Sequence, residues 1–247
     1  MPEATENVPT IVLVHGAFAD GSSWNGVIER LQGGGYAVVA PAIGLRGVAA
    51  DSAYLGGVVA QIEGPVLLVG HSYGGALISN ADTNPPNVVG LVFVAAFVPD
   101  ADEVLGEVTA ESKDAVLMQA LEQRDVPTGR TGETAPELHI DPGRFRDAFA
   151  ADLPPETAAV MAATQRPVAG AAFSDRCGAP AWKSLPSWAV VATQDKAAGA
   201  ALVRTMARRA GADITEIESS HVVMVSQPEV VTDVILEAAE TVSRPQR

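Results

Sequence analysis

The stretch LLVGHSYGGAL, residues 67–77, joins an apolar run to a turn that is rich in glycine. Ser72 lies at the junction, in a Gly-x-Ser-x-Gly pattern that begins at Gly70 and ends at Gly74. A serine in a tight strand-to-helix turn has a strained backbone, and the residues two positions away must be small for the chain to fold back. The pattern therefore predicts a buried strand, a sharp turn and a helix, with the Ser72 hydroxyl above the carboxyl end of the strand.

Apolar, β-branched runs predict strands at 10–16, 36–42, 65–72 and 88–98. They are apolar throughout rather than alternating, as parallel strands are when helices cover both faces of a sheet. Segments of helical length lie between them at 22–32, 51–62 and 73–81, with Ser22 or Ser23 and Asp51 as expected N-caps. The rhythm returns with strands at 187–195 and 213–220 and helices at 200–211 and 228–242. This alternation predicts an α/β fold with a doubly wound, mostly parallel sheet.

The rhythm stops between residues 101 and 187, where short apolar stretches with helical spacing are interrupted by proline and glycine. Examples are KDAVLMQALEQ at 113–123 and RFRDAFAADLPPETAAVMAAT at 144–164. We predict that 101–187 is a mostly helical cap inserted into a single domain. The α/β core of that domain then consists of residues 1–100 and 188–247.

Charge and composition argue against several classes of protein. The 247 residues carry 16 Lys and Arg against 30 Asp and Glu, a net charge of −14, which disfavours binding to nucleic acid or to an anionic membrane. The longest apolar run, 88–98, is shorter than the roughly 18 residues of a membrane span. The acidic N-terminus does not resemble a secretory signal, and Cys177, the only cysteine, excludes internal disulfides and cysteine-based metal sites. We expect a soluble, cytoplasmic protein without metal or cofactor.

The base that a serine nucleophile needs can be sought among four histidines. His71 is adjacent to Ser72, and its side chain should point away from the hydroxyl. His15 ends the first predicted strand, and His139 lies in the insertion. His221 follows the last predicted strand and so returns to the same carboxyl edge as Ser72. We predict that His221 is the base.

A carboxylate should orient His221 and stabilise its charged form. Asp195 ends the strand 187–195 and gives the chain order Ser, Asp, His that this architecture uses. Asp100, at the end of the run 88–98, is the alternative acid.

The oxyanion of a tetrahedral intermediate needs N–H donors. The amide of Tyr73, directly after Ser72, is one candidate. The other should come from the loop after the first strand, where Ala17 is the first choice and Phe18 the second.

With these residues in place, the chain resembles the α/β-hydrolase superfamily over nearly its full length, and within it the cofactor-independent carboxylesterases and methyl esterases. The stretches VLVHGAF, GHSYGG, TQDK and SSHVVMVSQPE carry the likeness. The resemblance implies acyl transfer to water through an acyl-enzyme, with the insertion as a cap over the substrate pocket. Gly16 and Val222 stand where hydroxynitrile lyases of this fold typically carry threonine and lysine. Ser72 stands where haloalkane dehalogenases carry aspartate, so both of these activities are disfavoured.

These observations predict a serine hydrolase that cleaves small-to-medium, largely apolar carboxylic esters. The alternatives are a lactonase, a perhydrolase or a pathway-specific cyclase or C–C hydrolase, because the same triad serves them all and the cap selects the carbonyl. A small-molecule receptor on a hydrolase scaffold is a further alternative. The expected pocket residues are aromatic or apolar: Phe18, Trp24, Phe145, Phe149, Met161, Phe173 and Trp182.

Overall fold

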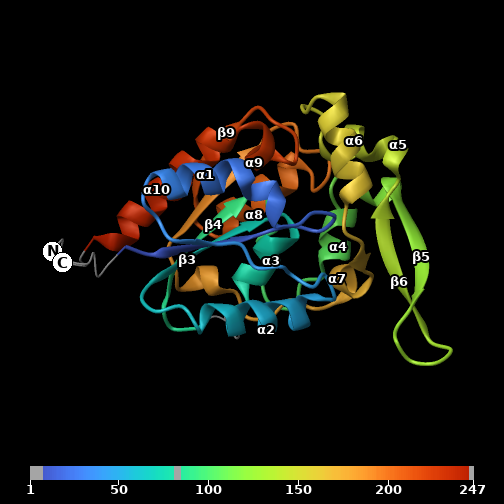
Figure 1. Cartoon of the computed structure of the whole chain (residues 1–247), viewed down its shortest axis with the longest axis horizontal. Helices are drawn as coiled ribbons and strands as arrows, with labels where there is room; N and C mark the ends of the chain where they lie inside the picture. Colours follow the sequence, from blue (N-terminus) through green and yellow to red (C-terminus); the bar gives the residue numbers. More distant parts are fainter. Residues whose placement is uncertain (1–7, 81–84, 245–247) are drawn as a thin grey trace.

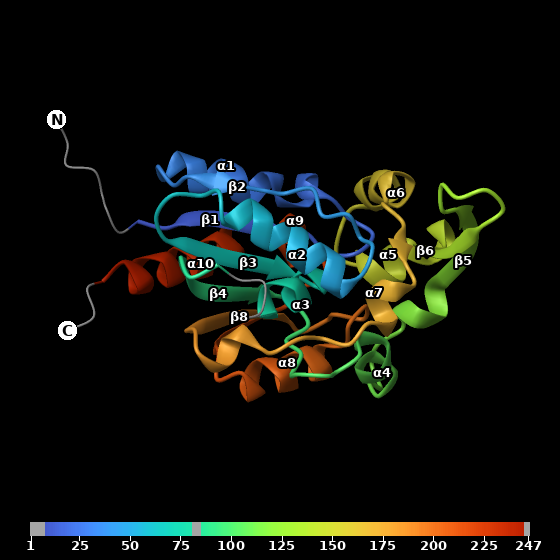
Figure 2. The same cartoon turned by 90° about the horizontal axis from the view of Figure 1, so that it is seen from below.

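The computed structural model describes residues 8–80 and 85–244. Within them, six parallel strands form one sheet in the order β2-β1-β3-β4-β8-β9. Figure 2 shows β1, β3, β4 and β8 side by side in this order. The strands are β1 Thr10–Val14, β2 Val38–Val39, β3 Val66–His71, β4 Val88–Val94, β8 Ser187–Ala192 and β9 Asp213–Ile217. The predicted parallel sheet is confirmed, although its outer strands are shorter than the apolar runs suggest.

Helices cover both faces of this sheet. Helix α1 (Asn25–Gly33) packs against α10 (Pro228–Ser243) on one face, while α2 (Val48–Val59) packs against α3 (Tyr73–Ser79) on the other (Figure 1). Helix α8 (Ala200–Arg209) contacts β8, and the short helices η1 (Gly21–Trp24) and α9 (Val223–Ser226) follow β1 and β9. The central strands β3, β4 and β8 are almost entirely buried between these layers, which explains their continuous apolar sequences.

Two expected helix starts differ from the structure. The first helical segment begins at Gly21, and Asp20 caps it by accepting the amide of Ser22, so neither predicted serine is the cap. Asp51 lies inside α2 rather than at its start, and it is buried. Residue 81, the expected end of α3, lies outside the described residues.

Residues 101–187, the predicted cap, are only partly helical. This segment contains α4 (Leu105–Ala110), η3 (Leu117–Ala120), α5 (Pro142–Phe149), α6 (Pro155–Thr164), α7 (Ala171–Ser174) and η4 (Ala181–Lys183). It also contains an antiparallel sheet of β5 (Leu121–Pro127), β6 (Thr134–Ile140) and β7 (Val168–Ala169). The expected helix over 113–123 is therefore wrong, because residues from Leu121 onward pair with β6 instead.

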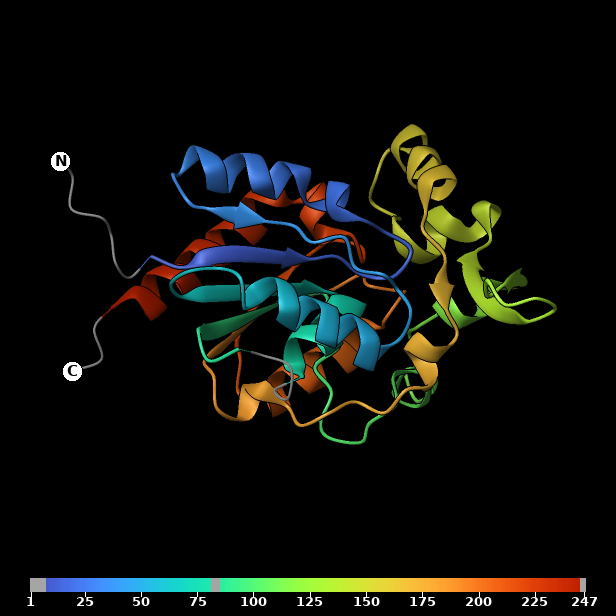
Figure 3. The same ribbon diagram turned by 60° about the horizontal axis from the view of Figure 1, so that its bottom comes forward.

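Of the elements in residues 101–187, those from α4 to α7 lie together at the carboxyl end of the sheet, with the β5–β6 hairpin on the outside (Figure 3), whereas η4 packs against α3. Strand β1 begins, and helix α10 ends, at the opposite end of the molecule (Figure 1). This arrangement places the loops that follow β1, β3, β8 and β9 beneath the cap.

Candidate active site

Ser72 occupies the turn between β3 and α3 with φ 51° and ψ −120°, a conformation that L-residues rarely adopt. The turn closes tightly around it. A Cβ atom on Gly70 would lie 2.6 Å from the Gly74 carbonyl oxygen, and one on Gly74 would lie 2.5 Å from the Val14 carbonyl oxygen. Both distances are far below contact, so only glycine fits at either position. The sequence pattern around Ser72 thus has the steric origin that we expected.

His221 and Asp195 meet at the carboxyl edge of the sheet. Nδ1 of His221 lies 2.8 Å from Oδ2 of Asp195, and both side chains are buried. The other carboxylate oxygen, Oδ1, accepts the amides of Ala197 and Ala198 at 2.8 and 3.0 Å. Because the carboxylate accepts, Nδ1 carries a proton, and in the neutral ring Nε2 keeps its lone pair. This Nε2 is buried and forms no hydrogen bond with any described residue, the Ser72 hydroxyl included.

Asp100, the alternative acid, has other partners. Its carboxylate accepts hydrogen bonds from Lys183 Nζ at 2.6 Å and from the Ala101 amide at 2.7 Å. The Lys183 bond lowers the pKa of the Asp100 carboxyl. The structure therefore brings Asp195, and not Asp100, to His221.

His71 supports His221 from behind. The two rings lie 4.7 Å apart, and Nε2 of His71 donates to the main-chain carbonyl of His221 at 3.0 Å. Burial lowers the pKa of His71 well below its usual value, which keeps the ring neutral. Trp24 packs edge-on against His71 at 6.4 Å and is completely buried. The structure thus places Trp24 under the site rather than in a pocket, contrary to expectation.

The other two histidines hold different parts of the chain. His15 accepts the Ile43 amide at Nε2 (3.1 Å), and its Nδ1 donates to the Gly16 carbonyl at 2.9 Å, which fixes the loop after β1. Burial lowers the pKa of His15 as well. His139 lies in β6 of the cap sheet, opposite Glu122.

The amides expected to bind an oxyanion are unused within the described chain. Those of Ala17, Phe18 and Tyr73 donate no backbone hydrogen bond there. The Tyr73 side chain points away from Ser72, because its hydroxyl donates to the buried carboxylate of Asp51 at 2.8 Å. The Tyr73 bond ties α2, which carries Asp51, to the first residue of α3. Asp51 also accepts the Arg46 amide at 2.9 Å and so holds the segment before α2. Sequence reasoning treated Asp51 only as a helix cap and missed this contact.

An aromatic side chain from the cap covers His221. The Phe149 ring, on α5, lies 5.0 Å from the His221 ring and meets Phe18 edge-on at 6.3 Å. Phe145 packs behind it at 5.2 Å. Ser72 is only 6% exposed under this cover.

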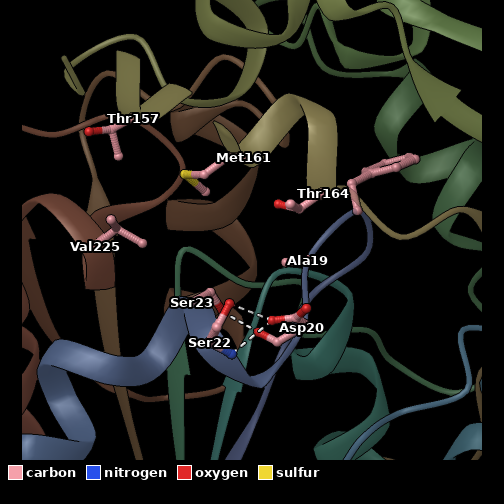
Figure 4. A pocket seen from close by; sticks show the side chains of 9 residues that line it. Ala19, Asp20, Ser22, Ser23, Thr157, Met161, Thr164 and Val225 are labelled. Carbon is pink, nitrogen blue, oxygen red and sulfur yellow. Dashed lines mark hydrogen bonds between the residues drawn. The ribbon is translucent and has the colours of Figure 1, made fainter. Parts of the chain in front are cut away.

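A pocket with a volume of about 120 Å³ lies beside this aromatic cover, and Phe18 forms part of its wall. Figure 4 shows Thr157, Met161 and Thr164 of α6 on one side and Asp20, Ser22 and Ser23 on the other. Of the predicted pocket residues, Phe18 and Met161 line this space. Its walls also include polar side chains, which were not among the residues predicted from the sequence.

Two further predicted pocket residues lie elsewhere. Phe173 is on α7, where its backbone carbonyl packs on Gly106 of α4. Trp182 donates from Nε1 to the Pro99 carbonyl at 2.9 Å, and Lys183 lies over its ring. The structure brings neither residue to the pocket.

Sequence reasoning also missed Asp152, in the turn between α5 and α6. Its carboxylate accepts hydrogen bonds from Ser219 and Ser220, the two residues before His221. The signal in the sequence was the pair of serines directly before His221. Both are buried, and a buried hydroxyl needs a hydrogen-bond partner, which Asp152 supplies.

The described residues contain neither a cluster of metal-ligating side chains nor a membrane-spanning helix. No group of three or more His, Cys, Asp or Glu side chains within them is placed to hold a metal ion. Within residues 8–80 and 85–244, no helix is both long enough and apolar enough to cross a membrane.

Known proteins resemble this chain in sequence. A pyrethroid hydrolase from Sphingobium wenxiniae is 30% identical over 168 residues, and a carbendazim hydrolyzing esterase from a Nocardioides species is 34% identical over 107 residues. The matched stretches cover 60% and 38% of this chain, but only 57% and 44% of these relatives.

Solved structures and a family model extend the likeness to most of the chain. The polyneuridine aldehyde esterase structure matches with a TM-score of 0.79 at 21% identity, covering 94% of this chain and 99% of that one. A pyrethroid hydrolase from Sphingobium faniae JZ-2 matches with a TM-score of 0.76 at 22% identity, covering 94% and 97%. At these identities the likeness concerns the fold. A model of the alpha/beta hydrolase family matches residues 11–234, and the chain therefore belongs to that family.

Proposed function

We propose that this protein hydrolyses carboxylic esters of small to medium, largely apolar groups, with Ser72 as nucleophile, His221 as base and Asp195 as orienting acid. The observation that carries the proposal is the buried Asp195–His221 hydrogen bond, which leaves Nε2 of the ring without a partner among the described residues. A buried ring nitrogen with a free lone pair is poised to accept a proton.

The reaction begins when the Ser72 oxygen attacks the ester carbonyl and its proton passes to Nε2 of His221. The hydroxyl must first turn toward Nε2, and such hydrogen bonds are often loose in ligand-free enzymes and tighten when substrate binds. The amides of Tyr73 and Ala17 donate to the oxyanion that forms, and the positive end of α3 adds to this stabilisation. His221 then gives its proton to the departing alkoxide, and a water molecule, activated by the same ring, hydrolyses the acyl-enzyme.

The apolar cover of the site indicates the kind of substrate. Phe149 lies against the His221 ring from residues 101–187 and meets Phe18 of the core edge-on, Phe145 supports Phe149, and Phe18 and Met161 line the neighbouring pocket. Such a lining favours an uncharged ester with an apolar acyl or alcohol group. Relatives named pyrethroid hydrolase and carbendazim hydrolyzing esterase are consistent with this class.

Hydrolysis of p-nitrophenyl butyrate tests the proposal. Ser72→Ala should lower kcat by about 10⁶-fold and Asp195→Asn by about 10⁴-fold, by analogy with other serine hydrolases. The matched controls are Ser174→Ala, at an exposed serine of the cap, and Asp100→Asn, at the alternative acid. Both controls should keep wild-type activity. Substantial turnover by Ser72→Ala would remove Ser72 from the mechanism.

The same assay series separates the alternative chemistries. We expect the protein to hydrolyse an aryl ester faster than it opens a lactone, and faster than it forms peracid from hydrogen peroxide and acetate. Sustained multiple turnover is expected of an enzyme, whereas a receptor would retain its ligand after a single slow turnover. A cytoplasmic location also stays a prediction, and fractionation of the source cells tests it.

A further inference from the structure

The cap contacts the His221 loop through a carboxylate. Oδ2 of Asp152 lies 2.8 Å from the Ser219 hydroxyl and 3.1 Å from the Ser220 amide, and Oδ1 accepts the Ser220 hydroxyl. These two serines immediately precede His221 and are themselves buried. One cap side chain therefore satisfies three donors on the segment that leads into the candidate base.

The hydrogen bonds continue to the other end of this segment. The hydroxyls of Ser219 and Ser226 lie 2.8 Å apart. Ser219 has a single hydroxyl proton; when it goes to the nearer acceptor, the carboxylate at 2.8 Å rather than the Ser220 carbonyl at 3.2 Å, Ser226 donates to Ser219. Asp152 thus ends a chain of hydrogen bonds that joins both ends of the segment carrying His221, and a carboxylate acceptor makes such bonds stronger than neutral ones.

Asp152 is itself held by the cap. Nε of Arg146, on α5, donates to the Leu153 carbonyl at 3.1 Å, and the Leu153 amide donates to the Ala150 carbonyl at 3.1 Å. Phe149, three residues before Asp152, packs on the imidazole of His221. One short stretch of the cap therefore contacts both the ring of His221 and the chain that leads to it.

The carboxylate is charged at neutral pH. Burial alone raises the pKa of Asp152, but the hydrogen bonds from Ser220 and Ser219 outweigh this effect and lower it. Asp152 is therefore a negatively charged hydrogen-bond acceptor at neutral pH.

We propose that Asp152 is a positioning residue for His221: by holding Ser219 and Ser220, this cap carboxylate sets the direction in which Nε2 faces Ser72. The inference rests on the proposed role of His221 as base. Asp195 orients the ring and His71 holds the His221 carbonyl, both from the core, whereas Asp152 makes the geometry of the base depend on the position of the cap.

Asp152→Asn is the decisive variant, because the amide keeps the shape of the side chain but loses one acceptor oxygen and the charge. Asp147→Asn, at an exposed carboxylate on the same stretch of the cap, is the matched control. With p-nitrophenyl butyrate, Asp152→Asn should lower kcat by about 10–100-fold, since a displacement of about 1 Å has effects of this size. KM should stay within about threefold of wild type, since the variant leaves the pocket lining unchanged. Asp152→Glu, which restores a carboxylate on a longer stem, should recover part of kcat.

A second measurement reads the imidazole directly and does not depend on activity. Proton–nitrogen NMR spectra of ¹⁵N-labelled protein should show shifted or broadened His221 ring signals in Asp152→Asn and unchanged ones in Asp147→Asn. If Ser72→Ala keeps its activity but the His221 ring signals still move in Asp152→Asn, the proposed function fails, whereas the influence of Asp152 on the His221 ring stands. Unchanged ring signals together with unchanged kcat would overturn the positioning role. A lower melting temperature with wild-type kcat would also overturn it, because it would mean that the carboxylate only stabilises the fold. If Asp152→Asn does not fold, Ser220→Ala removes a single bond of the same network and is judged by the same two outcomes.

Discussion

The strained backbone at Ser72 predicts an unusual pair of stabilities. Ser72 has φ 51° and ψ −120°. In this conformation a Cβ atom collides with the residue's own backbone, whereas glycine has no Cβ atom and adopts the conformation without strain. Ser72→Ala keeps the Cβ atom and therefore keeps the strain, whereas Ser72→Gly removes it. Both variants lose the hydroxyl, so the difference between them isolates the backbone.

The size of this difference follows from two opposing contributions. Relief of a sparsely populated conformation stabilises the folded state by about 1–3 kcal/mol. The extra freedom of glycine in the unfolded chain removes about 0.5–1 kcal/mol of this gain. At mid-range values of about 2 and about 0.75 kcal/mol, Ser72→Gly should therefore be more stable than Ser72→Ala by about 1.25 kcal/mol, which for a chain of this length raises the melting temperature by about 2.5–5 °C.

Urea unfolding and thermal melting of the two variants measure this difference. The control pair is Thr205→Gly and Thr205→Ala, at an exposed position inside helix α8. There the order should reverse, with the glycine variant less stable by about 1 kcal/mol. Equal stabilities for the two Ser72 variants, or a less stable glycine variant, would show that the turn carries no strain that glycine can relieve.

Three further predictions concern burial and close packing. Burial, with two nearby carboxylates, raises the pKa of Cys177 to about 12, so the native thiol should not react with Ellman's reagent at pH 8 but should react in urea; rapid reaction of the native protein would contradict this. Burial lowers the pKa of His15 and His71, so their neutral rings favour the folded state above the unfolded pKa of about 6.5, and this contribution is lost as the pH falls. Between pH 7 and 5.5, each ring should remove up to about 1.3 kcal/mol of unfolding free energy in urea titrations, and equal stability at both pH values would refute the assignment. Gly74→Ala puts a Cβ atom 2.5 Å from the Val14 carbonyl oxygen and should destabilise the fold by about 1–3 kcal/mol, whereas wild-type stability would mean that the turn can relax.

The core of the fold could be predicted because parallel strands impose two simple rules on the sequence. Strands buried on both faces must be apolar throughout, as β3 and β4 are. Their carboxyl ends meet at one edge, so residues that follow different strands come together there. The second rule is what brought Asp195 and His221 into contact in the prediction, although 26 positions separate them.

The cap could not be predicted by the same rules. Residues 121–127, LEQRDVP, begin with good helix formers, yet they form strand β5 because they pair with β6. Most of this strand is exposed, so no apolar face marks its period in the sequence. Nor does an aromatic side chain reveal which surface it covers. Trp24 packs under His71, while Phe149 lies over the His221 ring.

The buried serines before His221 show what a closer reading of the sequence could add. Ser219 and Ser220 end as buried as the apolar core, and a buried hydroxyl without a partner is costly. Residues at the carboxyl edge of this sheet are covered by residues 101–187, so that segment is one source of acceptors for these serines, beside Ser226 and the Ser220 carbonyl. The position of that acceptor, Asp152, depends on how α5 and α6 turn, which no local pattern encodes. On the proposed roles of Asp152 and His221, a change in residues 101–187 that moves α5 and α6 also moves His221, so variants of this segment selected for new esters should alter kcat as well as KM.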